Sequence, residues 1–265
     1  PAYGNSEQRL GSLLRGQRQH WVIVSKVGEE FDDGQSYFDF SPQHTRRSVE
    51  RSLRRLETDH IDLLLVHSNG QDVDILQHSG IYETLAQLKQ EGKIGGFGLS
   101  GKTVEGGLLA LQQGDCAMVT YNLAEQAEKP VLDYAASHGK AILIKKALAS
   151  GHACLTPGVD PVRASFELIF AHPGTSSAII GTINPVHLAD NRPPETPAIA
   201  DDRGLRYSPA AGALNFIQMQ HLRRPISIAD GQTFSAELAN LGVSVQLTLE
   251  WQNRDFWVLV RQHRP

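Results

Sequence analysis

The run Asp59-His60-Ile61-Asp62-Leu63-Leu64-Leu65-Val66-His67 predicts a buried strand that ends in a histidine. Its unbroken apolar stretch, Leu63 to Val66, is typical of parallel strands, because such strands are covered on both faces of the sheet. Residues 44–56, just before this run, place their apolar side chains on one helical face and their charged side chains elsewhere. The two segments together indicate a surface helix that packs on a parallel sheet.

The same pattern recurs on both sides of this segment. Short apolar and β-branched runs occupy residues 21–26, 95–100, 117–121, 141–145 and 177–181. Amphipathic stretches separate several of these runs, at residues 82–91 and 130–138. Strands that alternate with helices predict an α/β fold with a parallel sheet.

Polar or small residues stand at the carboxyl ends of these strands. They are Lys26, His67, Ser100, Lys145 and Gly181. In a parallel barrel the carboxyl ends of the strands form the active-site face. We therefore expect the chemistry of the protein to collect there.

Composition and charge exclude several classes of function. The chain of 265 residues has a formal net charge of −4, which provides no basic surface for nucleic acid or an anionic membrane. No apolar run approaches the roughly 20 residues of a membrane-spanning helix, and no signal sequence is visible, so we expect a cytoplasmic protein. Cys116 and Cys154 have no metal-ligand spacing around them, so no metal site is predicted.

The character of the sequence changes after Asn191. The stretch Arg192-Pro193-Pro194-Glu195-Thr196-Pro197 is rich in proline, as extended linkers are. We predict a linker at residues 193–204 and a small α+β module of unknown function at residues 205–265.

Within that module the pattern predicts both helices and a β-hairpin. Short helices are expected over residues 216–222 and 235–241. Residues 243–249 alternate between apolar and polar, and a turn at residues 253–255 leads into an apolar run at 256–260. Two such runs joined by a turn predict an antiparallel hairpin.

Three motifs carry a family resemblance. The opening Pro1-Ala2-Tyr3-Gly4-Asn5-Ser6-Glu7 has a tyrosine just before a predicted helix, the next strand carries Lys26, and the strand quoted first ends in His67. In this order they resemble the aldo-keto reductase family over residues 1–192. The resemblance implies a (β/α)8 TIM-type barrel that lacks its first two strands in this chain.

The resemblance implies a catalytic role for Tyr3, Lys26 and His67. Transfer of hydride to a carbonyl creates an alkoxide that must be protonated, and a tyrosine with a pKa of about 10 needs a nearby cation to act as that acid. Lys26 supplies the cation, Tyr3 donates the proton, and His67 donates a hydrogen bond that orients the substrate oxygen. Taken singly, each residue has a structural explanation, such as a lysine at a strand end that extends toward solvent.

The resemblance also implies a nicotinamide cofactor, NADP in the first place, with NAD as the other option. Ser100 corresponds to the residue that binds the carboxamide, whereas Met118 replaces a glutamine that usually assists it. Lys145 is suited to the pyrophosphate. The resemblance implies that the last strand and the short helix after it bind the adenosine end of the cofactor, because the free N–H groups at the start of a helix favour a phosphate. The residues concerned are Gly181, Thr182, Asn184, His187, Asp190 and Asn191.

Two functions remain open at this stage. The first is an oxidoreductase that uses NAD(P)H to reduce small-molecule aldehydes or ketones. The second is a non-catalytic protein that binds the nucleotide, or an inactive fragment, because the family's catalytic aspartate would lie upstream of Tyr3. A barrel without its first two strands also has an open edge, and we expect it to stay open unless another segment covers it.

Overall fold

The computed structural model describes residues 3–151 and 161–181, together with five short strands at 199–200, 205–207, 218–219, 248–251 and 254–259. Among these residues, no helix is both long enough and apolar enough to cross a membrane.

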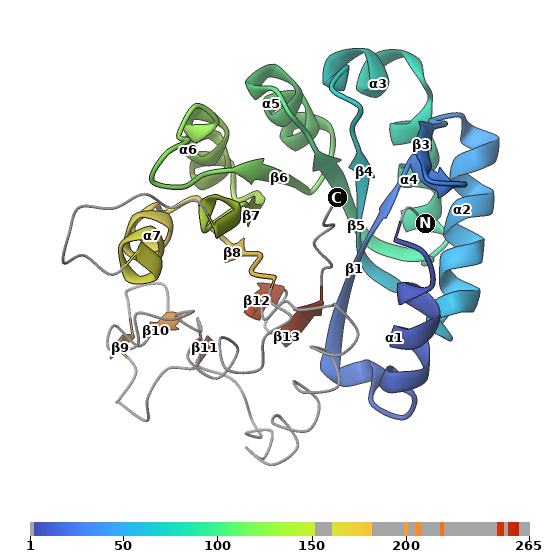
Figure 1. Ribbon diagram of the computed structural model, residues 1–265, viewed down its shortest axis with the longest axis horizontal. Helices are drawn as coiled ribbons and strands as arrows, with labels where there is room; N and C mark the ends of the chain where they lie inside the picture. The colour runs from blue at the N-terminus through green and yellow to red at the C-terminus, as the bar shows by residue number, and fades with distance from the viewer. Residues whose placement is uncertain are drawn as a thin grey trace.

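Six consecutive parallel strands of an eight-stranded sheet form the centre of the fold (Figure 1). In spatial order they are β1 (Trp21–Val27), β4 (Ile61–His67), β5 (Ile94–Ser100), β6 (Cys116–Thr120), β7 (Ala141–Lys145) and β8 (Ser177–Ala178). Each strand pairs in parallel with the next, so the carboxyl ends of all six lie at the same end of the sheet. The predicted α/β class with a parallel, barrel-type sheet is confirmed.

Helices cover the outer face of this sheet. They are α1 (Ser6–Leu14), α2 (Pro42–Leu56), α3 (Asp72–His78), α4 (Ile81–Gln90), α5 (Val104–Gln113), α6 (Lys129–His138) and α7 (Pro161–Ala171), with short 3-10 turns η1 (Arg18–His20) and η2 (Ala149–Gly151). The predicted helices at 44–56, 82–91 and 130–138 are confirmed as α2, α4 and α6. The sequence also explains where α2 begins: Ser41 accepts a hydrogen bond from the His44 N–H at 3.3 Å, and Pro42 stands in its first turn.

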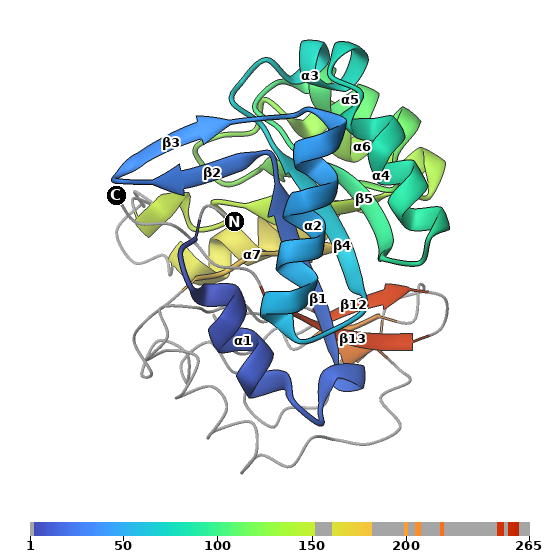
Figure 2. The ribbon, with the colours of Figure 1, turned by 90° about the vertical axis from the view of Figure 1, so that its right-hand side faces the viewer.

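Helices α1 and α2 lie side by side over β1 (Figure 2). Gly11 of α1 permits this approach, because a Cβ atom there would lie 2.4 Å from the Arg55 carbonyl oxygen of α2. The buried side chains beneath the helices form one core cluster under α1, α2 and α4 and a second under α6 and α7. A third cluster, with Val24, Leu65 and Met118 among its members, lies on the opposite face of the sheet.

A β-hairpin that the sequence analysis did not identify follows β1. It consists of β2 (Glu29–Asp32) and β3 (Gln35–Phe38), paired antiparallel. Asp33 and Gly34 form its turn with φ values of 44° and 77°, the left-handed conformation that two-residue hairpin turns require. This hairpin extends from the end of the sheet at which the strands terminate (Figure 2).

In the C-terminal part, β12 (Thr248–Trp251) and β13 (Arg254–Leu259) pair antiparallel, which confirms the predicted hairpin with shifted bounds. β13 also pairs in parallel with β1, at the edge that we expected to stay open unless covered. The helix predicted over 216–222 is wrong at Gln218–Met219, which form β11, because a partner strand outweighs weak local propensity.

Strand β11 pairs antiparallel with β10 (Leu205–Tyr207), which in turn pairs with β9 (Ile199–Ala200). The helix predicted over residues 235–241 lies outside the described residues. The division into residues 1–192, 193–204 and 205–265 stays a prediction.

Candidate active site

The structure brings the three candidate catalytic residues together. The Lys26 ammonium donates a hydrogen bond of 3.3 Å to the hydroxyl oxygen of Tyr3, and its Nζ lies 5.1 Å from the centroid of the Tyr3 ring. The centroid of the His67 ring lies 6.3 Å from that of Tyr3. A phenol, an ammonium and an imidazole thus share one site at the carboxyl end of the sheet.

Neighbouring elements hold these side chains in place. Lys26 and His67 come from the ends of β1 and β4, which pair directly through Lys26 and Leu65. Tyr3 precedes α1, whose Ser6 hydroxyl donates to the Tyr3 carbonyl oxygen at 2.9 Å. The next residue, Glu7, accepts a hydrogen bond of 2.9 Å from the hydroxyl of Ser25 on β1. The start of α1 is therefore tied to the strand that carries the lysine.

Burial and positive charge shift the ionisation of the site. Loss of hydration, with a contribution from the Lys145 ammonium, lowers the pKa of Lys26 to about 8. Loss of hydration and the ammonium groups of Lys26, Lys145 and Lys102 lower the pKa of His67 to about 3. At neutral pH the lysine is therefore charged and the histidine is neutral.

Glu29 is a member of this site that the sequence analysis missed. It is the first residue of β2, and its Oε2 atom contacts Nδ1 of His67. Gly28 makes the preceding turn with a φ of 104°, and a Cβ atom there would lie 2.5 Å from the ring of Phe40. The sequence held one signal for the hairpin that carries Glu29, the Asp33-Gly34 pair. Asp-Gly between two short runs is a strong indication of a hairpin.

Three of the predicted cofactor residues lie within the described part of the chain, Ser100 and Lys145 at the ends of β5 and β7 and Gly181 three residues after the end of β8. Ser100, which is buried, donates a hydrogen bond of 3.5 Å to the sulfur of Met118, a weak acceptor. The Lys145 ammonium donates to the Gly101 carbonyl oxygen, and burial lowers its pKa. Gly181 follows β8 and is half-buried. The other five residues lie outside the described part of the chain: Thr182, Asn184, His187, Asp190 and Asn191.

The buried carboxylate of Asp72 fixes the loops beside these strand ends. Its Oδ2 atom accepts hydrogen bonds from the backbone N–H groups of Lys102 and Thr103 at 2.7 and 2.8 Å and from the Thr103 hydroxyl at 2.9 Å. Its Oδ1 atom contacts the hydroxyl of Ser68, just after β4. Asp72 therefore joins the loop after β4 to the loop after β5, next to His67 and Ser100.

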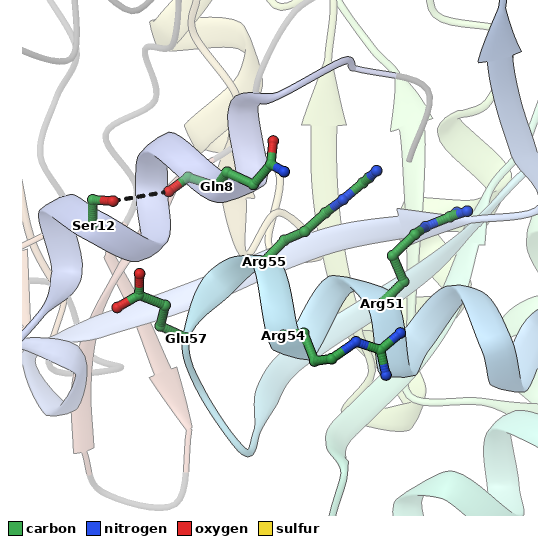
Figure 3. Close-up of a pocket in the computed structure, with 6 residues that line it drawn as sticks. All are labelled: Gln8, Ser12, Arg51, Arg54, Arg55 and Glu57. Atoms are coloured by element: carbon green, nitrogen blue, oxygen red, sulfur yellow. Dashed lines mark hydrogen bonds between the residues drawn. The ribbon is translucent and has the colours of Figure 1, made fainter.

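A groove between α1 and α2 gathers several arginines but is separate from this site (Figure 3). It is lined by Gln8, Ser12, Arg51, Arg54, Arg55 and Glu57. Arg51 contacts Glu30, Arg55 lies 3.7 Å from Glu7, and Glu57 pairs with Arg15 at 2.7 Å. Because most of its charges have partners within the protein, the groove has the character of a helix–helix contact.

Comparisons with known proteins agree with this arrangement. The model of the aldo/keto reductase family matches residues 1–156. A proposed aldo-keto reductase from Pseudomonas aeruginosa, known from a crystal structure, is 71% identical, with a TM-score of 0.67 over 72% of this chain and 73% of its own. An aldo-keto reductase from Bacillus halodurans in its holo form is 25% identical, with a TM-score of 0.54 over 64% and 66% of the two chains.

Among curated proteins, pyridoxal 4-dehydrogenase from Microbacterium luteolum is 29% identical over 188 residues, which are 56% of this chain and 55% of that protein. The chain spans about a third to about half of the length of the curated relatives it matches. The family match covers more than half of the chain, and the fold and the likeness to solved structures agree with it. The chain therefore belongs to the aldo/keto reductase family.

Proposed function

We propose that this protein reduces aldehydes or ketones to alcohols with NAD(P)H, and that Tyr3 is the proton donor. The observation that carries the proposal is the hydrogen bond of 3.3 Å from the Lys26 ammonium to the Tyr3 hydroxyl oxygen. A buried ammonium that donates to a phenol stabilises the phenolate, so the phenol becomes a stronger acid. This is the property that a tyrosine needs to protonate an alkoxide at neutral pH.

In the proposed reaction, each residue of the chain has one task. The Tyr3 hydroxyl gives its proton to the substrate oxygen as the carbonyl carbon is reduced, and the resulting phenolate is stabilised by the Lys26 ammonium. His67 lies beside the Tyr3 ring and fixes the direction of the substrate oxygen through Nε2. Lys26 and His67 stand near the ends of two strands that pair in one sheet, so their relative position is set before the substrate arrives.

The described residues fit a nicotinamide cofactor in two respects. Ser100 has a sulfur atom as its hydrogen-bond partner, and its hydroxyl is therefore readily turned toward a carboxamide. Lys145 and Lys102 place positive charge beside the catalytic residues, which suits a pyrophosphate. The bound cofactor supplies the hydride. We propose NADP as this cofactor, with Thr182, Asn184, His187, Asp190 and Asn191 at its adenosine end and NAD as the other option.

The names of relatives support the class of reaction without identifying a substrate. Pyridoxal 4-dehydrogenase is named for an oxidation, the removal of hydrogen from pyridoxal, whereas the proposed reaction is a reduction. The two directions use the same acid and base, because the proton donor in reduction is the proton acceptor in oxidation. We propose a small-molecule carbonyl compound as the substrate.

Cofactor binding and turnover, measured separately, test this proposal. Binding is followed by the fluorescence of NADPH and NADH, and turnover by the consumption of each with an aromatic aldehyde. We expect binding together with consumption that depends on the aldehyde. Binding without consumption would instead favour the non-catalytic alternative.

The reduction rate is expected to fall as pH rises through about 8. Below the Lys26 pKa of about 8 the side chain is charged and acidifies Tyr3, and above it the charge is lost. We therefore expect kcat/KM for reduction to decrease about tenfold per pH unit on the alkaline side. The measurement is kcat/KM between pH 6 and pH 10.

Lys26→Arg tests whether loss of the Lys26 charge causes the alkaline decrease in kcat/KM, because a guanidinium keeps its charge throughout this pH range. The alkaline decrease should move to higher pH in this variant, even if the rate itself is lower. Lys129→Arg is the matched control, since Lys129 is exposed and pairs with Asp133 on the surface of α6. An unchanged pH profile in Lys26→Arg would show that another group causes the decrease.

A further inference from the structure

We propose that Lys102 is a substrate-binding residue at the mouth of the site, where its ammonium binds an anionic group of the substrate. The substrate is then an aldehyde or ketone that also carries a carboxylate or a phosphate. This inference deepens the proposed function and rests on it. Three features of Lys102 carry it: a position beside His67, an anchored backbone, and an ammonium group with no partner among the described residues.

The first feature is the position of Lys102 relative to the catalytic histidine. His67 ends β4 and pairs with Ser100, which ends β5, and the Ser68 N–H donates to the Ser100 carbonyl oxygen at 3.3 Å. Lys102 comes two residues after Ser100. A Cβ atom at Gly70 would lie 3.7 Å from Cδ of Lys102. The aliphatic part of Lys102 therefore lies against the loop that follows the histidine.

The second feature is the anchored backbone of Lys102. Its N–H donates to Oδ2 of Asp72 at 2.7 Å, and the N–H of Thr103 donates to the same atom at 2.8 Å. Because Asp72 is buried, these two hydrogen bonds are shielded from water. The lysine side chain thus extends from a fixed point of the backbone, and less conformational freedom is lost when it binds a ligand.

The third feature is the free charge of Lys102. Lys26 donates to the Tyr3 hydroxyl oxygen at 3.3 Å, and Lys145 contacts the Gly101 carbonyl oxygen. Lys102 is exposed, and its ammonium forms no hydrogen bond or ion pair with the part of the chain that the structure describes. An ammonium has three donors for oxygen atoms, so Lys102 is available to bind an incoming anion.

The carboxylates at this end of the sheet do not neutralise Lys102. Asp72 accepts the hydrogen bonds described above and forms no ion pair with the Lys102 ammonium. Glu29 contacts the catalytic histidine, and Glu128 accepts a backbone N–H at the end of β6 at 2.7 Å. The Lys102 charge also acts on the site, because it contributes with Lys26 and Lys145 to the lowered pKa of the histidine.

The position of Lys102 favours the substrate over the cofactor as the source of the anion. Lys102 stands beside His67, which orients the substrate oxygen in the proposed reaction. Lys145 stands at the end of β7, two strands from β5, and remains suited to the pyrophosphate. A carboxylate or phosphate near the reacting carbonyl group would be attracted to this opening and would pair with the exposed ammonium.

Charged and neutral aldehydes of similar shape test this assignment. With NADPH, kcat/KM is measured for 3- and 4-carboxybenzaldehyde and for their uncharged methyl esters. We expect the unaltered protein to prefer at least one carboxylate over its ester by about fivefold, the upper effect of an exposed ion pair. Lys102→Met should remove this preference and leave the rates for the esters within about twofold. Lys102→Arg should retain it, because the guanidinium is also a cation.

Lys93→Met is the matched control, because Lys93 precedes β5 at the opposite end of that strand and its loss changes the net charge equally. It should leave the preference unaltered. NADPH fluorescence measures the Kd of the cofactor in each variant. Weaker NADPH binding in Lys102→Met with an unaltered preference would assign Lys102 to the pyrophosphate and overturn the proposal. Equal kcat/KM for both carboxylates and their esters in the unaltered protein would overturn it as well.

A binding measurement separates this proposal from the proposed function. The alcohols 3- and 4-(hydroxymethyl)benzoate and their methyl esters do not react with NADPH, so calorimetry in its presence reports binding alone. We expect at least one carboxylate to bind about fivefold more tightly than its ester, and Lys102→Met to abolish the difference. If the unaltered protein consumes no NADPH with any of the aldehydes, the proposed function fails, and calorimetry alone decides whether Lys102 binds the anion.

Discussion

Tyr3→Phe is expected to lower kcat/KM for carbonyl reduction by roughly 100- to 10,000-fold, the usual contribution of a positioned general acid. The substitution removes the hydroxyl group and leaves the ring, which lies beside His67 and Lys26. Packing is therefore retained and only the proton donor is lost. The measurement is the rate of NADPH consumption with benzaldehyde, at saturating cofactor.

Tyr37→Phe is the matched control for this experiment. Tyr37 lies on β3 and is 51% exposed, so loss of its hydroxyl should leave the rate within about twofold of the unaltered protein. NADPH fluorescence should show that Tyr3→Phe still binds the cofactor. If Tyr3→Phe keeps most of the activity, Tyr3 is not the proton donor.

Asp72→Ala is expected to reduce the free energy of unfolding by about 3 to 5 kcal/mol, because it removes a buried charged acceptor and leaves its donors without a partner. The donors that lose their acceptor are the backbone N–H groups of Lys102 and Thr103 and the hydroxyl of Thr103. Asp72 is only 1% exposed, so water is poorly placed to replace its carboxylate as the acceptor of these hydrogen bonds. The measurement is urea-induced unfolding followed by circular dichroism.

Asp74→Ala provides the comparison within the same helix. Asp74 is 71% exposed and pairs with His78 at 3.1 Å, one turn along α3. An exposed pair of this kind contributes about 0.5 kcal/mol or less. Equal losses of stability in the two variants would contradict the role of Asp72 as the connection between the loops after β4 and β5.

The sequence predicted the strands and helices well where the apolar pattern was regular. The strand at residues 61–67 is observed with these bounds, because its continuous apolar residues are buried on both faces of the sheet. The prediction was wrong at Gln218–Met219, where a short helix was expected and pairing with β10 determined a strand. Local patterns are weak guides wherever a partner from elsewhere in the chain decides the conformation.

The sequence by itself determined the order of Tyr3, Lys26 and His67 along the chain and the parallel sheet that carries two of them. These follow from apolar periodicity and from the residue at the end of each strand, which are local properties. Only the tertiary structure decided that Glu29 contacts His67 and that Asp72 joins two loops. Both depend on turns that bring distant segments within hydrogen-bond distance, and pairwise contacts of this kind leave no period in the sequence.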